Sequence, residues 1–258
     1  MPTIVSIHSY RGGTGKSNLT ANLASSLVQL GKRVAMIDTD IQSPGLHVLF
    51  GMDVHTIGLT LNDYLYGRCR IEQAAHDVTA KLGPTVALGG ALYLVPSNIK
   101  AGEITRVLRE GYEVNLLTDG FRTLMKALQL DYLIIDTHPG LNEETLLSII
   151  VSDIMILILR PDQQDFQGTA VTVEVARKLK LKHLLLVVNK VLPKLDTVSL
   201  RHQVQSVYNA PVAAILPVSE EMMELGSAGI FSLAYPDHPY SKGVREIAAQ
   251  IVNPREAR

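Results

Sequence analysis

The stretch SIHSYRGGTGKSN, residues 6–18, decides the fold of this protein. An apolar run leads into glycines at positions 12, 13 and 15, and Lys16 and Ser17 open a helical pattern that continues to Gly31. Glycines let a backbone turn with its N–H groups inward, and the start of a helix adds unpaired donors. The arrangement predicts a phosphate-binding loop of the pattern G-x-x-x-x-G-K-[ST], with Tyr10 where that pattern has its first glycine.

The chemistry of such a loop assigns candidate roles to its residues. The Lys16 ammonium would reach the β- and γ-phosphates of a nucleotide, and the Ser17 hydroxyl would ligate Mg²⁺. The remaining candidate nucleotide-binding positions of the loop are Gly12, Gly13, Thr14, Gly15 and Asn18. The alternative is a glycine-rich turn that binds no ligand, but strand, glycines, Lys-Ser and helix all favour the phosphate loop.

The bulk composition is that of one globular α/β domain spanning 1–258. Hydrophobic residues make up 47% of the 258 residues and charged residues 19%, which suits a sheet buried on both faces and excludes a disordered chain. The net charge of −1 provides no global attraction to nucleic acid or anionic lipid. A lone cysteine, Cys69, and no visible secretory signal lead us to expect a cytoplasmic protein.

The hydrophobic pattern predicts a mostly parallel, twisted sheet of about seven or eight strands with helices on both faces, because continuous apolar runs alternate with helical segments. The expected strands are Thr3–Ser9, Arg33–Asp38, Ala91–Val95, Tyr132–Asp136, Ile154–Leu159, Leu184–Asn189 and Val212–Leu216. The expected helices are Lys16–Leu30, Asn115–Leu128, Glu143–Val151, Phe166–Leu179, Thr197–Tyr208 and Ser241–Val252. The irregular segment 54–84 is expected to hold short helices around LTLNDYLYGR and IEQAAHDV.

Carboxylates follow two of these strands. Asp38 and Asp40 lie at the carboxyl end of the second expected strand, where such a sheet opens toward bound phosphates. Asp136 ends the strand DYLIID and fits a carboxylate that holds Mg²⁺ through water. Gly140, four residues later, could offer its N–H to the γ-phosphate, whereas His138 reads as an ordinary loop histidine.

The base of the nucleotide is indicated by the segment LLLVVNKVLPK. Asn189 and Lys190 begin the pattern N-K-x-D that recognises guanine, but Leu192 stands where that pattern requires aspartate. Without the carboxylate, the guanine N1–H and amino group have no acceptor, so adenine is favoured. Asn189 as an ordinary turn residue at a strand end is the alternative.

The stretch RGGTGKS, residues 11–17, resembles the deviant Walker A sequence K-G-G-x-G-K-[ST] of the MinD/ParA family of P-loop ATPases. That family also carries a variable residue at the position of Tyr10, and residues 136–140 resemble its D-x-x-P-G switch. The resemblance spans nearly the whole chain and implies a P-loop fold that binds ATP and Mg²⁺.

The resemblance also implies roles for particular residues. Asp40 would position or activate the attacking water, and Asp38 would lie in the outer shell of the metal. Asn189 would contact the adenine amino edge, with the backbone at Pro217 beside the base. In the family, the lysine that Arg11 replaces crosses an ATP-bridged dimer to touch the partner's phosphates; Arg11 keeps the charge and adds a planar fork suited to phosphate. The alternative is a local salt bridge that braces the loop.

These features favour a slow ATPase that acts as a timer: ATP closes a homodimer that binds a surface or partner, and hydrolysis releases it. Members of the family position division machinery, chromosomes, plasmids or other cargo through activating or adaptor proteins. The alternative function is a nucleotide-gated scaffold with little hydrolysis. The lone cysteine argues against a cluster carrier.

Direct contact with membrane or nucleic acid is disfavoured. The apolar stripe Val244, Ile247, Ala248, Ile251 and Val252 is expected to pack on the core, so a membrane anchor is not favoured. The segment ARKLKLKH, residues 176–183, could bind nucleic acid, but a solvated helix end, whose cations complement the helix dipole, is the preferred interpretation.

Overall fold

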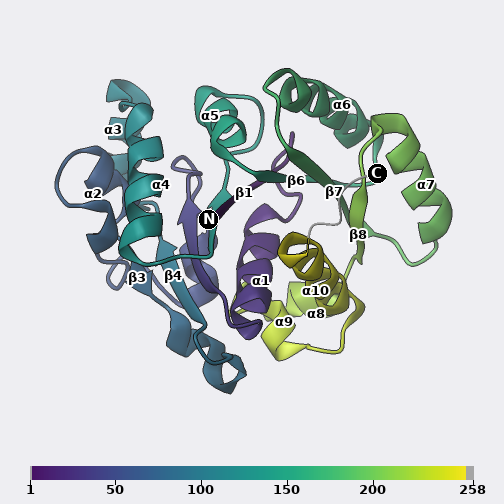
Figure 1. Ribbon diagram of the computed structural model, residues 1–258, viewed down its shortest axis with the longest axis horizontal. Coiled ribbons are helices and arrows are strands. Elements are labelled where there is room, and N and C mark those ends of the chain that lie inside the picture. Colours follow the sequence, from purple (N-terminus) through teal and green to yellow (C-terminus); the bar gives the residue numbers. More distant parts are fainter. Residues whose placement is uncertain (1, 254–258) are drawn as a thin grey trace.

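The sheet has eight strands in the order β3-β4-β2-β5-β1-β6-β7-β8 in the computed structural model, which describes residues 2–253 (Figure 1). All neighbours pair in parallel except β3, which runs antiparallel to β4. The strands are β1 Thr3–His8, β2 Arg33–Asp38, β3 His76–Asp77, β4 Ala91–Val95, β5 Tyr132–Asp136, β6 Ile154–Leu159, β7 His183–Val191 and β8 Val212–Pro217. The predicted mostly parallel α/β sheet is confirmed.

Helices cover both faces of this sheet (Figure 1). The α-helices are α1 Lys16–Gln29, α2 Leu61–Leu65, α3 Ala101–Glu110, α4 Asn115–Ala127, α5 Glu143–Val151, α6 Gln163–Lys178, α7 Thr197–Tyr208, α8 Glu220–Leu225, α9 Phe231–Ala234 and α10 Pro239–Val252. Three short 3₁₀ helices are η1 Leu46–Phe50, η2 Ile71–Gln73 and η3 Thr79–Thr85. The helices α1 and α10 pack on each other, and α4, α5, α6 and α7 lie on the opposite face.

The central strands are largely apolar because they are buried on both sides. Val5 and Ile7 of β1 belong to the core cluster beneath α1 and α10, whereas the preceding residue Ile4 belongs to the cluster beneath α4. Successive side chains of a strand point to opposite faces, so a strand between two helical layers has no polar face to show. This burial holds the central strands in register.

Helix starts differ from the prediction where a polar residue caps the first turn. The helix α6 begins at Gln163 because the Asp162 carboxylate accepts the N–H of Asp165. The helix α10 begins at Pro239, a favoured first helical residue, after His238. The expected strand ends at Ser9 and Asn189 also shift, to His8 and Val191.

The segment 54–84 is predicted only in part. The short helix around LTLNDYLYGR is present as α2, where Thr60 and Asp63 form a capping box. In IEQAAHDV the expected short helix is present only as the 3₁₀ helix η2, Ile71–Gln73, after which the chain enters the edge strand β3. Tertiary pairing of β3 with β4 overrides the local helical pattern.

The apolar stripe of α10 packs on the core, as predicted. Val244 and Ile247 are fully buried, Ala248 and Ile251 nearly so, and Val252 packs against the same core cluster. Across residues 2–253, the structure contains no helix long and apolar enough to cross a membrane.

Candidate nucleotide and metal site

The carboxyl ends of three adjacent strands bring the predicted site residues together. Asp38 of β2 pairs in register with Asp136 of β5, and Asp136 pairs with Ile7 of β1. The loop that follows β1 leads directly into α1. Residues separated by about a hundred positions in sequence therefore meet at one edge of the sheet, which is where open α/β folds bind ligands.

The phosphate loop has the backbone that its glycines predict. Gly13 and Gly15 have φ values of +72° and +100°, a left-handed region that favours glycine, and Gly15 is the N-cap of α1. Lys16 is nearly buried, and its ammonium donates to the Ser9 hydroxyl at 3.2 Å. Burial lowers the pKa of Lys16, while the nearby charges of Asp136 and Asp40 oppose this.

Two consecutive residues of β7 hold the phosphate loop in place. The side-chain amide of Asn189 donates to the Thr14 carbonyl at 2.8 Å, and the Lys190 ammonium donates to the Gly13 carbonyl at 2.8 Å. The carbonyl oxygen of the Asn189 side chain accepts the N–H of Lys190. Asn189 is thus a brace of the loop, and its contact with adenine, like that of Pro217 at the end of β8, stays a prediction.

Replacing Gly15 by alanine is expected to weaken nucleotide binding at least tenfold. An added Cβ would lie 2.6 Å from the Asn189 side-chain nitrogen, at a φ of +100° that alanine resists. Loss of the loop geometry would misplace the donors that surround the phosphates. Titration of a fluorescent ATP analogue measures the effect, with Gly102→Ala, an uncrowded position on α3, as the control. Unchanged affinity would contradict the role of this loop.

Asp136 has the environment of a carboxylate that needs a cation. It is 1% exposed, and neither of its oxygens has a hydrogen-bond partner. Burial raises its pKa to about 6, although the hydroxyls of Ser17 and Thr20 and the ammonium of Lys16 lie close enough to oppose the rise. A buried, unpartnered carboxylate beside a serine hydroxyl is an oxygen donor set that fits Mg²⁺.

Among residues 2–253, no cluster of three or more His, Cys, Asp or Glu side chains could hold a metal by itself. This agrees with a Mg²⁺ bound by few protein oxygens together with phosphate oxygens and water. Asp38 serves the fold instead: its carboxylate accepts the N–H groups of Asp40, Gly45 and Leu46, which fixes the loop after β2. An outer-shell role for Asp38 stays a prediction.

The loop after β2 presents Asp40 to the same edge of the sheet. One oxygen of Asp40 accepts both the backbone N–H and the hydroxyl of Ser43, at 3.1 and 3.0 Å. That oxygen also lies 3.8 Å from the Nε2 atom of His138, which belongs to the loop after β5. In the sequence, His138 is interpreted as an ordinary loop histidine, because no local pattern shows that these two loops meet.

His8 is a further site residue that sequence reasoning missed. It ends the apolar strand β1, is fully buried, and its Nδ1 lies 2.7 Å from the Thr137 hydroxyl oxygen. That hydroxyl donates to the Ile7 carbonyl, so Nδ1 of His8 carries the proton of their bond. Burial and the Lys16 charge lower the pKa of His8 to about 3, so a neutral imidazole ties β1 to the loop after β5.

Arg11 makes local ion pairs in the single chain. Its guanidinium lies 3.5 Å from Asp162 and 3.4 Å from Asp165, at the start of α6. Arg160 binds Asp165 more closely, at 2.9 Å, and the nearly buried Asp165 therefore keeps a partner without Arg11. The local brace that the sequence left as an alternative is present, and the contact across a dimer stays a prediction.

Gly140 is hydrogen-bonded to the segment before the phosphate-binding glycines. Its N–H donates to the Ser9 carbonyl at 3.2 Å, and its φ is +85°. Contact with a γ-phosphate would require this bond to break. The left-handed backbone at Gly140 is one that glycine can leave at low cost, which suits a switch.

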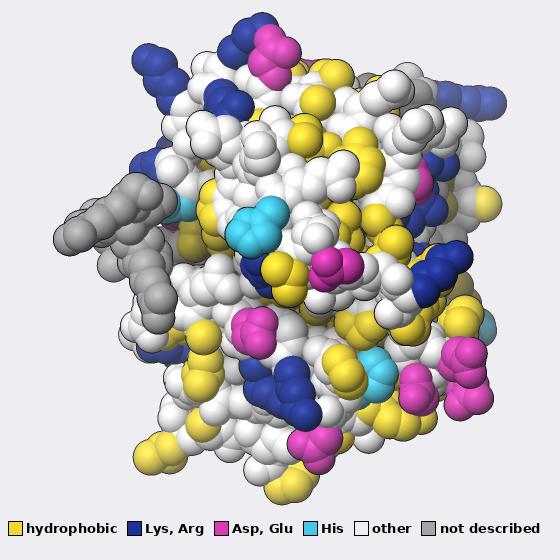
Figure 2. Space-filling view, turned by 90° about the vertical axis from the view of Figure 1, so that its right-hand side faces the viewer, with side chains coloured by type: hydrophobic (Ala, Val, Ile, Leu, Met, Phe, Trp, Pro, Cys, Tyr) yellow, Lys and Arg dark blue, Asp and Glu magenta, His cyan; other side chains and the backbone are white. Residues whose placement is uncertain are grey.

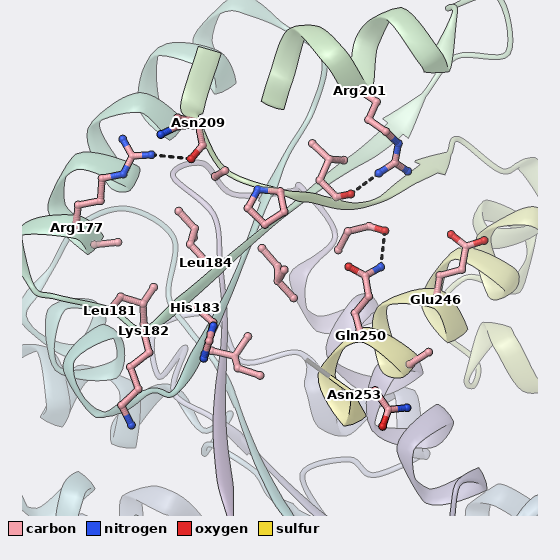
Figure 3. Close-up of a pocket in the computed structure, with 18 residues that line it drawn as sticks. Arg177, Leu181, Lys182, His183, Leu184, Arg201, Asn209, Glu246, Gln250 and Asn253 are labelled. Carbon is pink, nitrogen blue, oxygen red and sulfur yellow. Dashed lines mark hydrogen bonds between the residues drawn. The ribbon is translucent and has the colours of Figure 1, made fainter. Parts of the chain in front are cut away.

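A hollow of about 910 Å³ lies at the opposite edge of the sheet, away from these residues (Figure 3). Arg177 and Arg201 line it, but their guanidinium groups donate to backbone carbonyls, Arg177 to those of Tyr208 and Asn209 and Arg201 to that of Val212. These arginines therefore stabilise the end of α7 and the start of β8. The hollow is not the nucleotide site.

The basic segment 176–183 is largely paired. Lys178 lies 2.7 Å from Glu174, and Lys182 lies 2.6 Å from Asp153. Figure 2 shows acidic and apolar side chains between the basic ones on the face turned toward the viewer. These contacts support the interpretation of the segment as a helix end.

Comparisons with known proteins agree with this geometry. A family described as an AAA domain matches residues 2–190. An uncharacterized ATP-binding protein of Methanocaldococcus jannaschii is 26% identical over 98% of this chain and 88% of its own length. The crystal structure of the cell division ATPase MinD of Pyrococcus furiosus superposes with a TM-score of 0.81 at 21% identity, covering 99% and 100% of the two chains. The septum site-determining protein MinD of Pyrococcus horikoshii, complexed with Mg-ADP, superposes with a TM-score of 0.79 at 21% identity, covering 98% and 97%. At these identities the structures establish a shared fold.

Proposed function

Because this chain belongs to the MinD/ParA family of deviant Walker A P-loop ATPases, we propose that it is a Mg²⁺-dependent ATPase that works as a dimerising molecular switch. The family acts in positioning the septum site and in partitioning. For this chain, ATP would close a homodimer, and slow hydrolysis stimulated by a partner would open it.

The observation that carries this proposal is the surroundings of Asp136. A buried carboxylate with two unpartnered oxygens lies beside Lys16, at the end of a strand next to the phosphate loop. Leaving such a group unpaired is costly, and this cost supports the proposal of a cation at this position. Mg²⁺ would be held by Ser17 directly and by Asp136 through water, and would neutralise charge on the β- and γ-phosphates.

The residues of this chain would then supply placement and electrostatic stabilisation. The loop from Gly12 to Ser17 surrounds the phosphates with N–H donors, and Lys16 contacts the transferred group. Asp40 orients the attacking water. Gly140 exchanges its bond with Ser9 for one to the γ-phosphate, which would couple nucleotide state to the loop after β5.

The names of related proteins support a positioning role. Similar chains are called a cell division ATPase and a septum site-determining protein, and one of the latter was solved with Mg-ADP. We propose that this chain likewise works in the cytoplasm on large cellular cargo through an activating or adaptor protein. Its nucleotide-dependent surface would be a protein-binding one.

A second candidate function is a scaffold that binds ATP and partners but hydrolyses little. The pairing of Arg11 with Asp162 and Asp165 favours it, because a guanidinium held within its own chain is not placed for phosphates of a second copy. The close pairing of Arg160 with Asp165 favours the switch, because Arg11 can leave without exposing a buried unpaired charge.

Size-exclusion chromatography with light scattering, run with phosphate release in parallel, tests the two functions. The 28.2 kDa chain is expected to be monomeric with Mg²⁺-ADP and to double in mass with Mg²⁺-ATP. Arg11→Ala is expected to remain monomeric with ATP, and Arg11→Lys, which keeps the charge, to dimerise. If wild type binds ATP but neither dimerises nor releases phosphate, the scaffold is the better account. If Arg11→Ala dimerises like wild type, Arg11 only braces its loop.

A further inference from the structure

The hydrogen bond between His138 and Pro139 fixes which ring nitrogen carries a proton. The Nδ1 atom of His138 lies 2.7 Å from the Pro139 carbonyl oxygen. A carbonyl oxygen only accepts, so Nδ1 must donate. In the neutral imidazole, the other nitrogen, Nε2, then presents a lone pair.

That lone pair faces the carboxylate of Asp40. The distance from Nε2 to the nearer Asp40 oxygen is 3.8 Å, too long for a direct hydrogen bond. Ser43 holds this oxygen in place with its N–H and its hydroxyl. While the imidazole is neutral, Nε2 and this carboxylate oxygen are two acceptors on either side of one gap and cannot satisfy each other.

A water molecule is the group that fits between them. It has two hydrogens to donate, and with ordinary bond lengths of about 2.8 Å to each acceptor the 3.8 Å separation gives an angle of about 85° at its oxygen, so each hydrogen bond bends by about 10°. Both side chains are partly exposed, His138 by 24% and Asp40 by 15%, so solvent can reach the gap. A single acceptor leaves a water free to turn, whereas two fix the direction of its oxygen lone pairs.

The gap also lies within the electrostatic reach of the phosphate loop. The negative charge of Asp40 acts on Lys16 of that loop. The two acceptors come from the loops after β2 and β5, the strands whose ends carry Asp38 and Asp136. Water held there is on the side of the sheet where the terminal phosphate would lie.

We propose that His138, together with Asp40, holds the water that attacks the terminal phosphate of ATP. This proposal rests on the proposed ATPase function. In the step, the water oxygen forms a bond to the γ-phosphorus, the bond from that phosphorus to the bridging oxygen breaks, and ADP leaves with the electron pair. One proton of the water passes to Asp40 and then to the products, while His138 accepts a hydrogen bond from the other.

The competing role for His138 is structural. In that role Nδ1 braces the loop through its hydrogen bond to Pro139, and Nε2 binds no water. Substituting His138 with asparagine or with glutamine distinguishes the structural role from the water-binding role. Asparagine carries its amide near the position of Nδ1 and can keep the bond to Pro139, but it has no acceptor at the position of Nε2. Glutamine places its amide near Nε2 and restores an acceptor there.

The experiment measures single-turnover phosphate release and nucleotide affinity for wild type, His138→Asn and His138→Gln. His138→Asn is expected to lower the rate about 10- to 100-fold, as loss of one positioned hydrogen bond does, with ATP affinity unchanged within about twofold. His138→Gln is expected to recover the rate to within about fivefold of wild type. Equal rates for wild type and His138→Asn would overturn the proposal, and so would a glutamine variant as slow as the asparagine one.

A second measurement does not depend on turnover. Mg²⁺-ADP with aluminium fluoride mimics the phosphate during attack and binds together with the attacking water, so His138→Asn is expected to bind this complex at least tenfold more weakly than wild type while binding Mg²⁺-ADP equally well. Equal affinity for the complex would overturn the proposal. If the ATPase function itself is wrong, the result differs: wild type and every variant alike release no phosphate. That outcome would also overturn the proposed role of His138.

Discussion

Asp136→Asn is expected to make the ligand-free protein more stable at neutral pH while removing the effect of Mg²⁺ on ATP binding. The carboxylate is buried without hydrogen-bond partners, so its ionised form is costly. Asparagine has nearly the same shape and no charge. The residue that the function requires is thus expected to reduce stability, as active-site residues often do.

The direction of the pH effect follows from the raised pKa. Well below pH 3.8, Asp136 is protonated in both the folded and the unfolded chain and does not affect the free energy of unfolding. As pH rises toward 6, the unfolded chain ionises at its ordinary pKa of 3.8, while the folded chain holds its proton up to about 6. The free energy of unfolding therefore falls across this window and stays low above it. A pKa difference of about two corresponds to roughly 3 kcal/mol.

Thermal unfolding from pH 4 to pH 8 in EDTA, with ATP titrations with and without Mg²⁺, measures both effects. At pH 7.5 the melting temperature of Asp136→Asn is expected to exceed that of wild type by about 5–10 °C, with little difference at pH 4. Asp237→Asn, which removes an exposed carboxylate, is the control and should shift neither quantity. An asparagine variant less stable than wild type at pH 7.5 would show that Asp136 makes a favourable contact in the ligand-free state.

Asp40→Ala is expected to lower phosphate release at least 100-fold while leaving the ATP-bound dimer intact. Asp40 lies at the edge of the site, its charge acts on Lys16, and its own carboxylate is held by Ser43 rather than by the phosphate loop. Removing it takes away an acceptor for the attacking water but no donor to the phosphates. The dimer should therefore form and persist.

Light scattering at intervals after adding Mg²⁺-ATP, with phosphate release from the same samples, measures this outcome. Wild type should return to monomer as ATP is consumed, whereas Asp40→Ala should not. Asp40→Asn is the matched variant, because the asparagine oxygen can still accept the hydrogen bonds from Ser43. This variant removes the negative charge but keeps the support of the loop. A variant that hydrolyses at the wild-type rate would exclude Asp40 from the reaction.

Much of the fold was predictable because burial leaves a strong pattern in the sequence. The strands Arg33–Asp38 and Ile154–Leu159 have their predicted ends, since all their residues except Arg33 are buried and polar residues mark the limits. The helix α3 was not predicted. Glycines lie within it and directly after it, and its apolar residues are few.

The residues of the site were largely predictable, but its contacts were predictable only where they form within one segment. The glycines, Lys16 and Ser17 lie within residues 12–17, and their spacing alone predicts the backbone of the phosphate loop. The contact of His138 with Asp40 and the brace from Asn189 to Thr14 depend on which strands become neighbours, and the local pattern does not contain that information. Arg11 has two possible partners, and only the folded chain places Asp162 and Asp165 beside it.

The brace from β7 has a consequence for how the protein is made. The bond from Asn189 to Thr14 joins residues 175 positions apart, and β1 needs β5 and β6 on its two sides. Such distant pairings close large loops and form late in folding. During synthesis from the amino terminus, the phosphate loop is complete in sequence early but receives its brace only after β7 has emerged. We therefore expect a growing chain to gain nucleotide affinity late, when nearly three-quarters of it has been translated.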